Sequence, residues 1–597
     1  MKIKVSDYIA RYLTKYGVRR VFMVTGGGAM HLNNSFGKNK LLKCIFMHHE
    51  QACAIAAEGY ARVSGKLAVV NVTTGPGGLN TLTGVMGQWT DSVPVLYISG
   101  QVKSETTIAS CPNIRLRQLG DQEVDIVSVV RPLTKFAATV RKAEDIRKLL
   151  DKAINLAATG RPGPVWLDIP LDIQGAVIEE NNLIGSGIIL RREPDNIDGK
   201  IRHFLELLEK SKRPVIVAGN GIRIAGAKEF LLALIRKLKV PVLSTFNGFD
   251  LVPSDNPYFI GRIGTLGSRA GNFALQNSDL VLCLGTRNNI RQVSYNWQSF
   301  AHAAKKVVVD IDSAELKKPT IKPDIAINCD AGLFLSKFLQ YKISGFDCKD
   351  WLLWCSKRRD KYPVVLPEYS RSASVNPYYF MRVLTELARP GETIVTANAT
   401  PSVVLFQAGI VKDKQRVIWN SGCAAMGYDL PASIGACIGN GNRDIICIAG
   451  DGSIQMNIQE LQTIKYNKLP IKIFVLNNGG YSSIRQTQEN FFGPPYVGCD
   501  KKSGVSFPSF VKVAGAFGIK AAKITTHKGM PEKILKIINS EGAILCEVML
   551  ETNYKFAPRL SSSKLDNGKI VSSRLEDMSP FLDRKEFKEN IFIQEGN

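Results

Sequence analysis

Short runs of β-branched and other apolar residues alternate with helix-patterned stretches along almost the whole chain. Examples are KLAVVNVTT at 66–74, SDLVLCLGT at 278–286 and DIICIAGDG at 444–452, each ending in Thr or Gly. A strand that is buried on both faces needs an apolar run of this kind, and parallel strands are joined by helices. The pattern therefore predicts α/β domains, in which helices cover parallel sheets.

At 597 residues the chain is too long for a single hydrophobic core, so several domains are expected. Polar, irregular stretches near 178–200 and 355–375 interrupt the strand–helix pattern twice. We therefore predict three doubly wound parallel-sheet domains and an irregular C-terminal tail. Their boundaries are 1–175, 195–345 and 370–555 for the domains and 556–597 for the tail.

The chain is basic, with a net charge of +24 from 77 Lys and Arg against 53 Asp and Glu. Such a charge would suit nucleic acid, an acidic membrane surface or anionic small molecules. The basic residues are dispersed and do not alternate with aromatic residues, as a groove for single strands requires. We therefore predict no nucleic-acid partner. The alternative, a DNA-binding protein, would show a steep salt dependence of binding.

Other properties indicate the cellular compartment. No stretch approaches ~20 consecutive apolar residues, and the amphipathic start predicts a first helix and no signal peptide. The twelve cysteines are scattered without a CxxC pair, as expected of free thiols in a reducing compartment. We predict a cytoplasmic protein without a membrane segment.

The third segment contains polar residues at the ends of two predicted strands. Asp451 lies between two glycines after the run IICIA, and Asn478 ends the run IKIFVLNN. Ligands of open parallel sheets bind at this edge, and glycine lets the backbone approach a phosphate. Asp451, the Asn478 amide oxygen and a carbonyl near Gly480 suit Mg²⁺ held jointly with a diphosphate. Either pair alone would be explained as turn residues, but two pairs flanking one strand–helix unit favour a site.

This arrangement resembles the thiamine-diphosphate motif, in which GDG is followed by NN at a similar spacing. SGCAAMGYDLPASIGA at 421–436 resembles the family segment in which an apolar residue wedges under the cofactor, and Met426 occupies that position. HHEQACAIAAEGYAR at 48–62 resembles the segment whose carboxylate faces the aminopyrimidine, and Glu50 falls on that acid. Apolar neighbours predict that Glu50 is buried, which suits proton transfer, although a Glu that begins a helix is usually exposed.

Over nearly its whole length the chain resembles the acetohydroxyacid (acetolactate) synthase-like family, with GQV at 100–102 and DQEVDIV at 121–127 as close matches. The resemblance implies a pyrimidine-binding, a central Rossmann-like and a diphosphate-binding domain. It also implies thiamine diphosphate and Mg²⁺ as cofactors, and a homodimer or homotetramer with active sites at the subunit interface. The implied residues are Glu50, Gly27, Gly28, His31 and Gln122 for catalysis, Asn80, Met426, Gly450, Asp451, Gly452, Ser453 and Asn478 for the cofactor, and Asp451, Asn478 and Gly480 for the metal.

The central segment resembles flavin-binding synthases at GRIGTLGSRAGNFAL, 261–275, and GTRNNIRQVS, 285–294. The resemblance implies FAD in a structural role, with Asp310 near a ribose and Arg287 and Arg291 facing phosphates. Leu266 stands where the family has His, and Asn-Asn-Ile replaces Phe-Asp-Asp. The alternative is a flavin-free central domain, as in the related decarboxylases.

The acceptor is predicted from NNGGYSSIRQTQENFF at 477–492, which aligns with the synthase pocket. Thr487 and Ser483 replace the family's Trp and Met, which favours a bulkier, hydroxylated acceptor over 2-oxobutyrate. GGGAMHL at 26–32 and LEDMSPFL at 575–582 also resemble carboligases of bacterial branched-chain sugar synthesis, such as that of yersiniose.

We therefore predict a carboligase that decarboxylates pyruvate and transfers the two-carbon acetyl (hydroxyethyl) unit to a ketone. The predicted acceptor is the 4-keto carbon of a CDP-3,6-dideoxyhexose, a nucleotide sugar. Two alternatives within the same superfamily stay open. One is an acetolactate synthase that makes acetolactate from pyruvate, and the other is a hydrolase of cyclic diketones.

Overall fold

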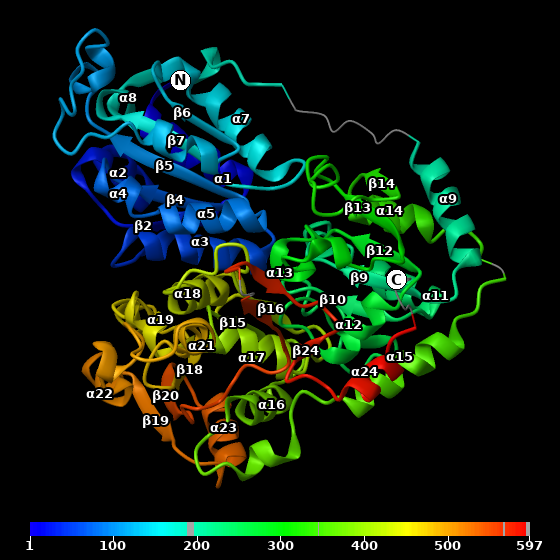
Figure 1. Ribbon diagram of the computed structural model, residues 1–597. Coiled ribbons are helices and arrows are strands. Elements are labelled where there is room, and N and C mark those ends of the chain that lie inside the picture. The colour runs from blue at the N-terminus through cyan, green and yellow to red at the C-terminus, as the bar shows by residue number, and fades with distance from the viewer. Residues whose placement is uncertain (188–195, 344, 565–566, 593–597) are drawn as a thin grey trace.

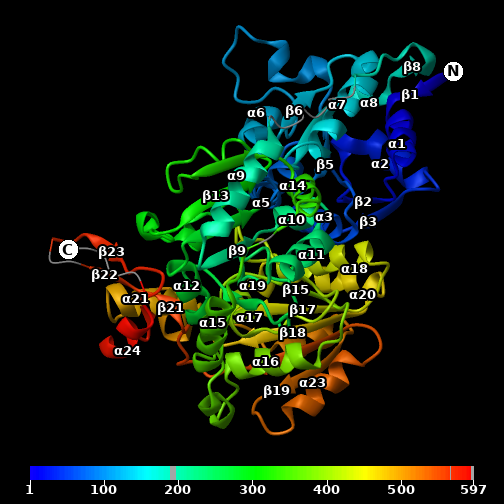
Figure 2. The same ribbon diagram turned by 90° about the vertical axis from the view of Figure 1, so that its right-hand side faces the viewer.

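The computed structural model describes residues 1–187, 196–343, 345–564 and 567–592. Three domains each contain a six-stranded parallel sheet with helices packed against it (Figures 1 and 2). The predicted fold class is therefore confirmed. Within the described ranges, no helix has both the length and the apolar composition needed to cross a membrane.

The N-terminal domain has the strand order β3-β2-β4-β5-β7-β6. Its strands are β2 (Arg20–Met23), β3 (Lys43–Phe46), β4 (Ala68–Val72), β5 (Val95–Gln101), β6 (Phe136–Thr139) and β7 (Val165–Pro170). Its helices include α1 (Val5–Tyr16), α2 (Met30–Lys38), α3 (Glu50–Ser64), α4 (Pro76–Leu79), α5 (Leu82–Asp91), α7 (Ile146–Ala158) and α8 (Leu171–Gly175). A small antiparallel pair joins β1 (Lys2–Lys4) to β8 (Val177–Glu179).

The central domain has the order β11-β10-β9-β12-β13-β14. Its strands are β9 (Pro214–Ala218), β10 (Val242–Ser244), β11 (Phe259–Arg262), β12 (Leu280–Leu284), β13 (Lys305–Asp310) and β14 (Ile325–Asn328). Its helices include α9 (Ile197–Lys210), α11 (Lys228–Leu238), α12 (Arg269–Gln276), α14 (Ala331–Phe338) and α15 (Lys349–Lys361). Strand order reverses between β9 and β12, which is the arrangement of dinucleotide-binding sheets, and ligands bind at that point.

The third domain has the order β16-β15-β17-β18-β20-β19. Its strands are β15 (Thr393–Thr396), β16 (Arg416–Ile418), β17 (Ile445–Gly450), β18 (Ile471–Asn477), β19 (Lys520–Ile524) and β20 (Ile544–Met549). Its helices include α16 (Pro377–Leu387), α17 (Thr400–Ala408), α18 (Asp429–Gly439), α19 (Asp451–Gln455), α20 (Glu460–Tyr466), α21 (Ser482–Phe491), α22 (Phe510–Ala516) and α23 (Met530–Ile538). Counted along the chain, the order of its strands is the same as in the N-terminal domain.

Helices α3 and α18 join the first and third domains (Figure 1). A side chain at Gly435 would lie 1.8 Å from the carbonyl oxygen of Ala56, and one at Gly59 would lie 2.2 Å from that of Ala432. Only glycine allows so close an approach of two helices. Buried residues of both domains consequently form one continuous hydrophobic core.

The C-terminal tail contains more regular structure than predicted. Short antiparallel pairs join β21 (Arg559–Leu560) to β24 (Met578–Ser579) and β22 (Ser562–Lys564) to β23 (Ile570–Ser572), and α24 spans Arg584–Glu589. Asn272 of α12 donates a hydrogen bond to the Leu575 carbonyl at 2.8 Å, and Leu575 belongs to the core of the central domain. The described part of the tail therefore packs on that domain.

Candidate active site

Asp451 lies at the carboxyl end of β17 and is 3% exposed. One carboxylate oxygen accepts hydrogen bonds from the amides of Asn478, Gly479 and Gly480, at 3.0, 2.9 and 3.3 Å. The other accepts from the Gly452 amide at 2.8 Å. Burial raises the pKa of Asp451 to about 6, and these hydrogen bonds oppose the rise. The structure thus brings the two predicted strand ends together around one carboxylate.

The side-chain oxygen of Asn478 is buried and has no hydrogen-bond partner within the described residues. The preceding Asn477 points elsewhere, because its amide donates to Glu547 at 2.8 Å. Buried polar atoms are normally paired, so an unpaired oxygen beside a buried carboxylate fits a cation. The described parts of the chain contain no cluster of three or more acidic, His or Cys side chains that would hold a metal alone. The residues therefore fit Mg²⁺ that shares its remaining ligands with a diphosphate.

Two further residues connect this end of β17 to the segment that contains Met426. Ser453 accepts a hydrogen bond from the Gly427 amide at 2.9 Å. A side chain at Gly452 would lie 2.3 Å from the ring of Tyr481 and 3.2 Å from the terminal methyl of Met426, so glycine is required there. A Cβ added at Gly450 would lie 3.6 Å from its nearest neighbour, which is an ordinary contact distance. The structure therefore does not require glycine at position 450.

Glu50 begins α3 at the carboxyl edge of the N-terminal sheet and is half-buried. Asn80 donates a hydrogen bond to its Oε2 at 3.0 Å. Its Oε1 faces Gly77, where an added Cβ would lie 3.8 Å away. The prediction of a buried Glu50 is therefore wrong for the single chain, because the residue lies at an open sheet edge and burial begins two residues later, at Ala52.

Asn457, which has no exposed surface, connects the two halves of the candidate site. Its amide donates to Gln51, next to Glu50, at 2.9 Å and to the Gly427 carbonyl, next to Met426, at 2.8 Å. The N-terminal end of α3, which contains Glu50, thus lies beside the segment that contains Met426 within one chain. The subunit arrangement stays a prediction.

The glycine turn after β2 lies beside the loop that faces Glu50. Side chains at Gly26 and Gly28 would collide with Thr73 and Thr74, at 2.5 and 1.9 Å. A Cβ added at Gly27 would have no atom of the described residues within 4 Å. Gly27 and Gly28 begin a short 3₁₀ turn, whose first amides have no partner inside the turn. This geometry is compatible with the predicted oxyanion-binding role.

His31 and Gln122 contact different segments of the N-terminal domain. The His31 ring packs against α8, with Nε2 at 3.0 Å from the position of a Cβ on Gly175, so it points toward that helix. Gln122 is exposed and has a φ of 61°, and its carbonyl would lie 1.9 Å from a Cβ on Gly75. Gln122 therefore lies against the loop that leads to Gly77, and its role remains a prediction.

A cavity of about 280 Å³ opens at the point where the strand order of the central sheet reverses. Its lining includes Asn220 after β9, Arg287 after β12 and Asp310 at the end of β13. Burial raises the pKa of Asp310 to about 6. Arg287 donates to Glu315 at 3.1 Å and to the Thr90 carbonyl at 2.7 Å.

Arg291 lies nearby against Phe246, with its guanidinium carbon 4.4 Å from the ring centre. Within the described residues its guanidinium has neither a hydrogen-bond acceptor nor a carboxylate partner, and burial lowers its pKa. A largely buried cation without a counter-ion fits an anionic ligand such as a phosphate. The cavity, the strand order and this arginine together fit a dinucleotide such as FAD.

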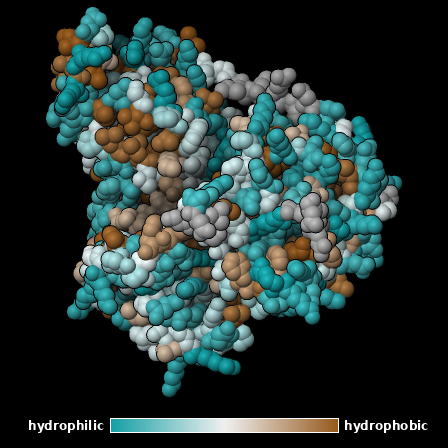
Figure 3. All heavy atoms as spheres, in the orientation of Figure 1, coloured by the Kyte–Doolittle hydropathy of each residue, from teal (hydrophilic) through white to brown (hydrophobic). Residues whose placement is uncertain are grey.

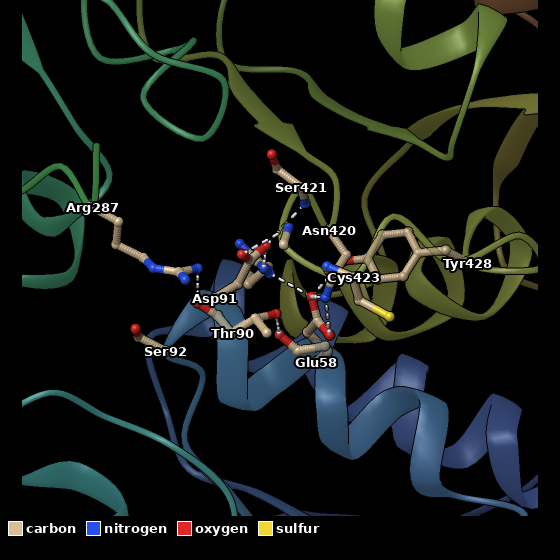
Figure 4. Close-up of polar contacts among 12 residues, drawn as sticks. Glu58, Thr90, Asp91, Ser92, Arg287, Asn420, Ser421, Cys423 and Tyr428 are labelled. Atoms are coloured by element: carbon tan, nitrogen blue, oxygen red, sulfur yellow. Dashed lines mark hydrogen bonds and ion pairs between the residues drawn. The ribbon is translucent and has the colours of Figure 1, made fainter. Parts of the chain in front are cut away.

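Figure 4 shows a buried polar network that joins α3 and α5 of the N-terminal domain to the segment before Met426, beside Arg287 of the central cavity. Asp91 accepts hydrogen bonds from the amides of Ser421 and Gly422 at 3.0 and 3.1 Å and pairs with Arg62 at 2.8 Å. Glu58 accepts from Asn420 and from Tyr428. The network fixes the segment that leads to Met426. Asp91, Glu58 and Asn457 were not predicted from the sequence, because each has a partner in the other domain that lies more than 300 positions away.

The predicted acceptor residues lie on α21. Thr487 is exposed, and its hydroxyl donates to the Ser483 carbonyl one turn earlier at 3.1 Å. Ser483 is half-buried. Both side chains are small, which leaves room at these two positions, and the acceptor itself stays a prediction.

Comparison with known families matches all three domains. Residues 3–129 match the N-terminal TPP binding domain of thiamine pyrophosphate enzymes, 201–338 their central domain and 400–548 their C-terminal TPP binding domain. The acetolactate synthase large subunit of Lactococcus lactis is 31% identical over 582 residues, covering 97% of this chain and 98% of the relative. That of Cyanidium caldarium is 33% identical over 570 residues, covering 92% and 94%. Acetolactate synthase 3 of Brassica napus is 31% identical over 573 residues, covering 94% and 85%.

Proposed function

The chain belongs to the thiamine pyrophosphate enzyme family, and we propose that it decarboxylates pyruvate and joins the resulting two-carbon unit to a ketone. It is a thiamine-diphosphate-dependent enzyme that forms carbon–carbon bonds, with acetolactate synthases as relatives. The single observation that supports the proposed site is the junction at Asn457, which brings the Glu50 end of α3 beside the Met426 segment. Pyruvate as the donor follows from the synthase relatives.

When bound, thiamine diphosphate supplies the electron sink that makes the loss of CO₂ from a 2-oxo acid possible. Glu50 holds and exchanges a proton through Oε1, because Asn80 occupies its Oε2. The amides of Gly27 and Gly28 stabilise the negative charge that develops on the acceptor oxygen. Met426 supports the cofactor from the third domain, and Ser453 fixes the backbone beside it.

Asp451, the Asn478 amide oxygen and the Gly480 carbonyl are the proposed Mg²⁺ ligands. The unpaired Asn478 oxygen supports this assignment. A magnesium ion held by these residues would supply the positive charge that offsets both the Asp451 carboxylate and the diphosphate. Gly452 leaves space for the Tyr481 ring and the Met426 methyl at this end of β17, because it has no side chain.

The proposed acceptor is a hydroxylated ketone, the 4-keto carbon of a CDP-3,6-dideoxyhexose. The room left by the small side chains of Ser483 and Thr487 supports it. Acetolactate synthase, in which a second pyruvate is the acceptor, is the alternative and agrees at least as well with the relatives. A competition experiment between the keto sugar and pyruvate distinguishes the two possible acceptors. Adding the keto sugar to a pyruvate reaction should divert the two-carbon unit and lower acetolactate formation, and an unchanged acetolactate rate would favour the alternative.

FAD is proposed for the central cavity, in a structural role. Replacing Arg291 by Ala is expected to weaken flavin binding about 10- to 100-fold, because a charged hydrogen bond to a buried phosphate stabilises by roughly 1.5–3 kcal/mol. The measurement is flavin fluorescence released when the purified protein is denatured. Arg358, which stacks on Trp354 of α15 at 4.0 Å, provides the control variant Arg358→Ala. Wild-type protein that neither releases nor binds FAD would identify a flavin-free central domain.

A homodimer is proposed because α4 and α5 present an apolar stripe, and Figure 3 shows a hydrophobic area on the N-terminal domain to which these helices belong. Leu79 of α4 and Met86 and Trp89 of α5 are 38%, 42% and 38% exposed, and Met86 and Trp89 lie one helical turn apart. The stripe begins one residue before Asn80, the partner of Glu50. A second copy docked there would therefore border the active site.

Replacing Met86 by Asp is expected to shift the protein toward monomer, since a charge in an apolar interface loses its hydration. Sedimentation velocity measures the shift as a function of concentration. Tyr466→Asp is the control, because Tyr466 is 79% exposed on α20, outside the stripe. A dimer unaffected by the change at Met86 would mean that another surface joins the subunits.

A further inference from the structure

Three buried hydroxyl groups surround the side-chain nitrogen of Asn478. They belong to Thr400 at the start of α17, Ser482 at the start of α21 and Tyr554 after β20, and these residues are 3%, 4% and 7% exposed. Asn478 Nδ2 lies 3.0 Å from the Tyr554 oxygen, 3.4 Å from that of Ser482 and 3.5 Å from that of Thr400. The Asn478 oxygen has no partner in the described chain.

The hydroxyls also contact one another in a closed triangle. Tyr554 lies 2.5 Å from Thr400 and 2.8 Å from Ser482, and Thr400 lies 3.3 Å from Ser482. A tyrosine hydroxyl, whose ordinary pKa is about 10, keeps its hydrogen at neutral pH. Each hydroxyl supplies one hydrogen and accepts through lone pairs. When each donates to the next, the three contacts use all three hydrogens.

Only lone pairs of the triangle then face Asn478. The amide must therefore turn its NH₂ group toward the hydroxyls, and its oxygen faces away from them. We propose that Tyr554, together with Thr400 and Ser482, is a positioning residue that keeps the Asn478 oxygen available to the magnesium ion. This inference rests on the magnesium site proposed above.

Tyr554 is anchored independently of its hydroxyl. Its carbonyl accepts a hydrogen bond from Gln486 of α21 at 3.3 Å, and the Phe556 amide donates to the same Gln486 side chain at 3.2 Å. The Tyr554 and Phe556 rings pack edge to face, with their centres 5.9 Å apart. Replacing Tyr554 by Phe should therefore remove the hydroxyl and leave the ring in place.

In the Tyr554→Phe variant, Thr400 and Ser482 keep one mutual contact but have two hydrogens. The spare hydrogen can be donated to the Asn478 oxygen, so the amide can turn over and direct its NH₂ group at the cation. The dissociation constant for Mg²⁺, measured by calorimetry with saturating thiamine diphosphate, should rise about 10- to 100-fold, as when other partners that orient metal ligands are lost. Thermal unfolding without cofactor should change little.

The matched control is Tyr378→Phe, because this second buried tyrosine of the same domain binds Gln407 and the Ala557 amide through its hydroxyl and does not contact Asn478. Thr400→Ser, which keeps the hydroxyl, should bind Mg²⁺ like the wild type, and Thr400→Val should resemble Tyr554→Phe. Unchanged Mg²⁺ affinity in Tyr554→Phe, or equal weakening in both tyrosine variants, would overturn the positioning role. A wild-type protein without Mg²⁺-dependent cofactor binding would instead overturn the magnesium site itself.

Discussion

Replacing Glu50 by Gln is expected to lower the rate of pyruvate decarboxylation by about 10²- to 10⁴-fold, the usual contribution of a positioned acid–base group. Gln has nearly the shape of Glu and can still accept the hydrogen bond that Asn80 donates at 3.0 Å. It cannot exchange a proton as a carboxylate does. Binding of thiamine diphosphate and Mg²⁺ should therefore change little, because Asp451 and Asn478 belong to the other half of the site.

Release of CO₂ from pyruvate measures the rate, and calorimetry measures cofactor affinity in the same preparation. Glu144→Gln is the control, since Glu144 is exposed in the short turn Ala143–Asp145 that precedes α7. A Glu50→Gln variant within about twofold of the wild-type rate would mean that another group activates the cofactor. Loss of cofactor binding together with activity would show a structural role for Glu50.

The second large effect is expected at Asp451. Replacing it by Asn removes the only carboxylate among the proposed magnesium ligands. It also places an NH₂ group next to backbone amides, because four of them donate to the two oxygens of Asp451. A buried donor that faces donors is unsatisfied. Cofactor affinity should therefore fall by at least about 100-fold, more than for loss of a residue that only orients a ligand.

Titration of thiamine diphosphate at fixed Mg²⁺ measures this loss through intrinsic protein fluorescence. The control is Asp444→Asn, because Asp444 lies at the opposite, amino end of β17, where it pairs with Lys472 at 3.5 Å. Equal affinity in the wild type and the Asp451→Asn variant would place the diphosphate elsewhere. Equal loss in both variants would indicate damage to the strand.

The local parts of this account could be predicted from the sequence. The apolar run before Asp451 and the run before Asn478 each define a buried strand, and parallel strands must end at one edge of the sheet. That logic identified the carboxylate and the amide that the structure brings together. It also distinguished the three domains, because each repeats the alternation of strand and helix.

Contacts between distant segments could not be predicted in the same way. Asn457 lies 406 positions from Gln51, and Tyr554 lies 76 from Asn478. Nothing in the neighbouring sequence of either residue indicates such a partner. The direction of the His31 ring and the half exposure of Glu50 also depend on packing around the sheet edge, which the hydrophobic pattern does not describe.

The most direct test of the proposed function follows ¹³C-labelled pyruvate by NMR with purified protein, thiamine diphosphate, Mg²⁺ and the CDP-linked 4-keto-3,6-dideoxyhexose. The account predicts labelled CO₂ and a labelled two-carbon branch on the sugar, both dependent on thiamine diphosphate and both absent with Glu50→Gln. Rapid acetolactate formation that is indifferent to the sugar would contradict the proposed acceptor. Pyruvate left unchanged under all these conditions would contradict the carboligase itself.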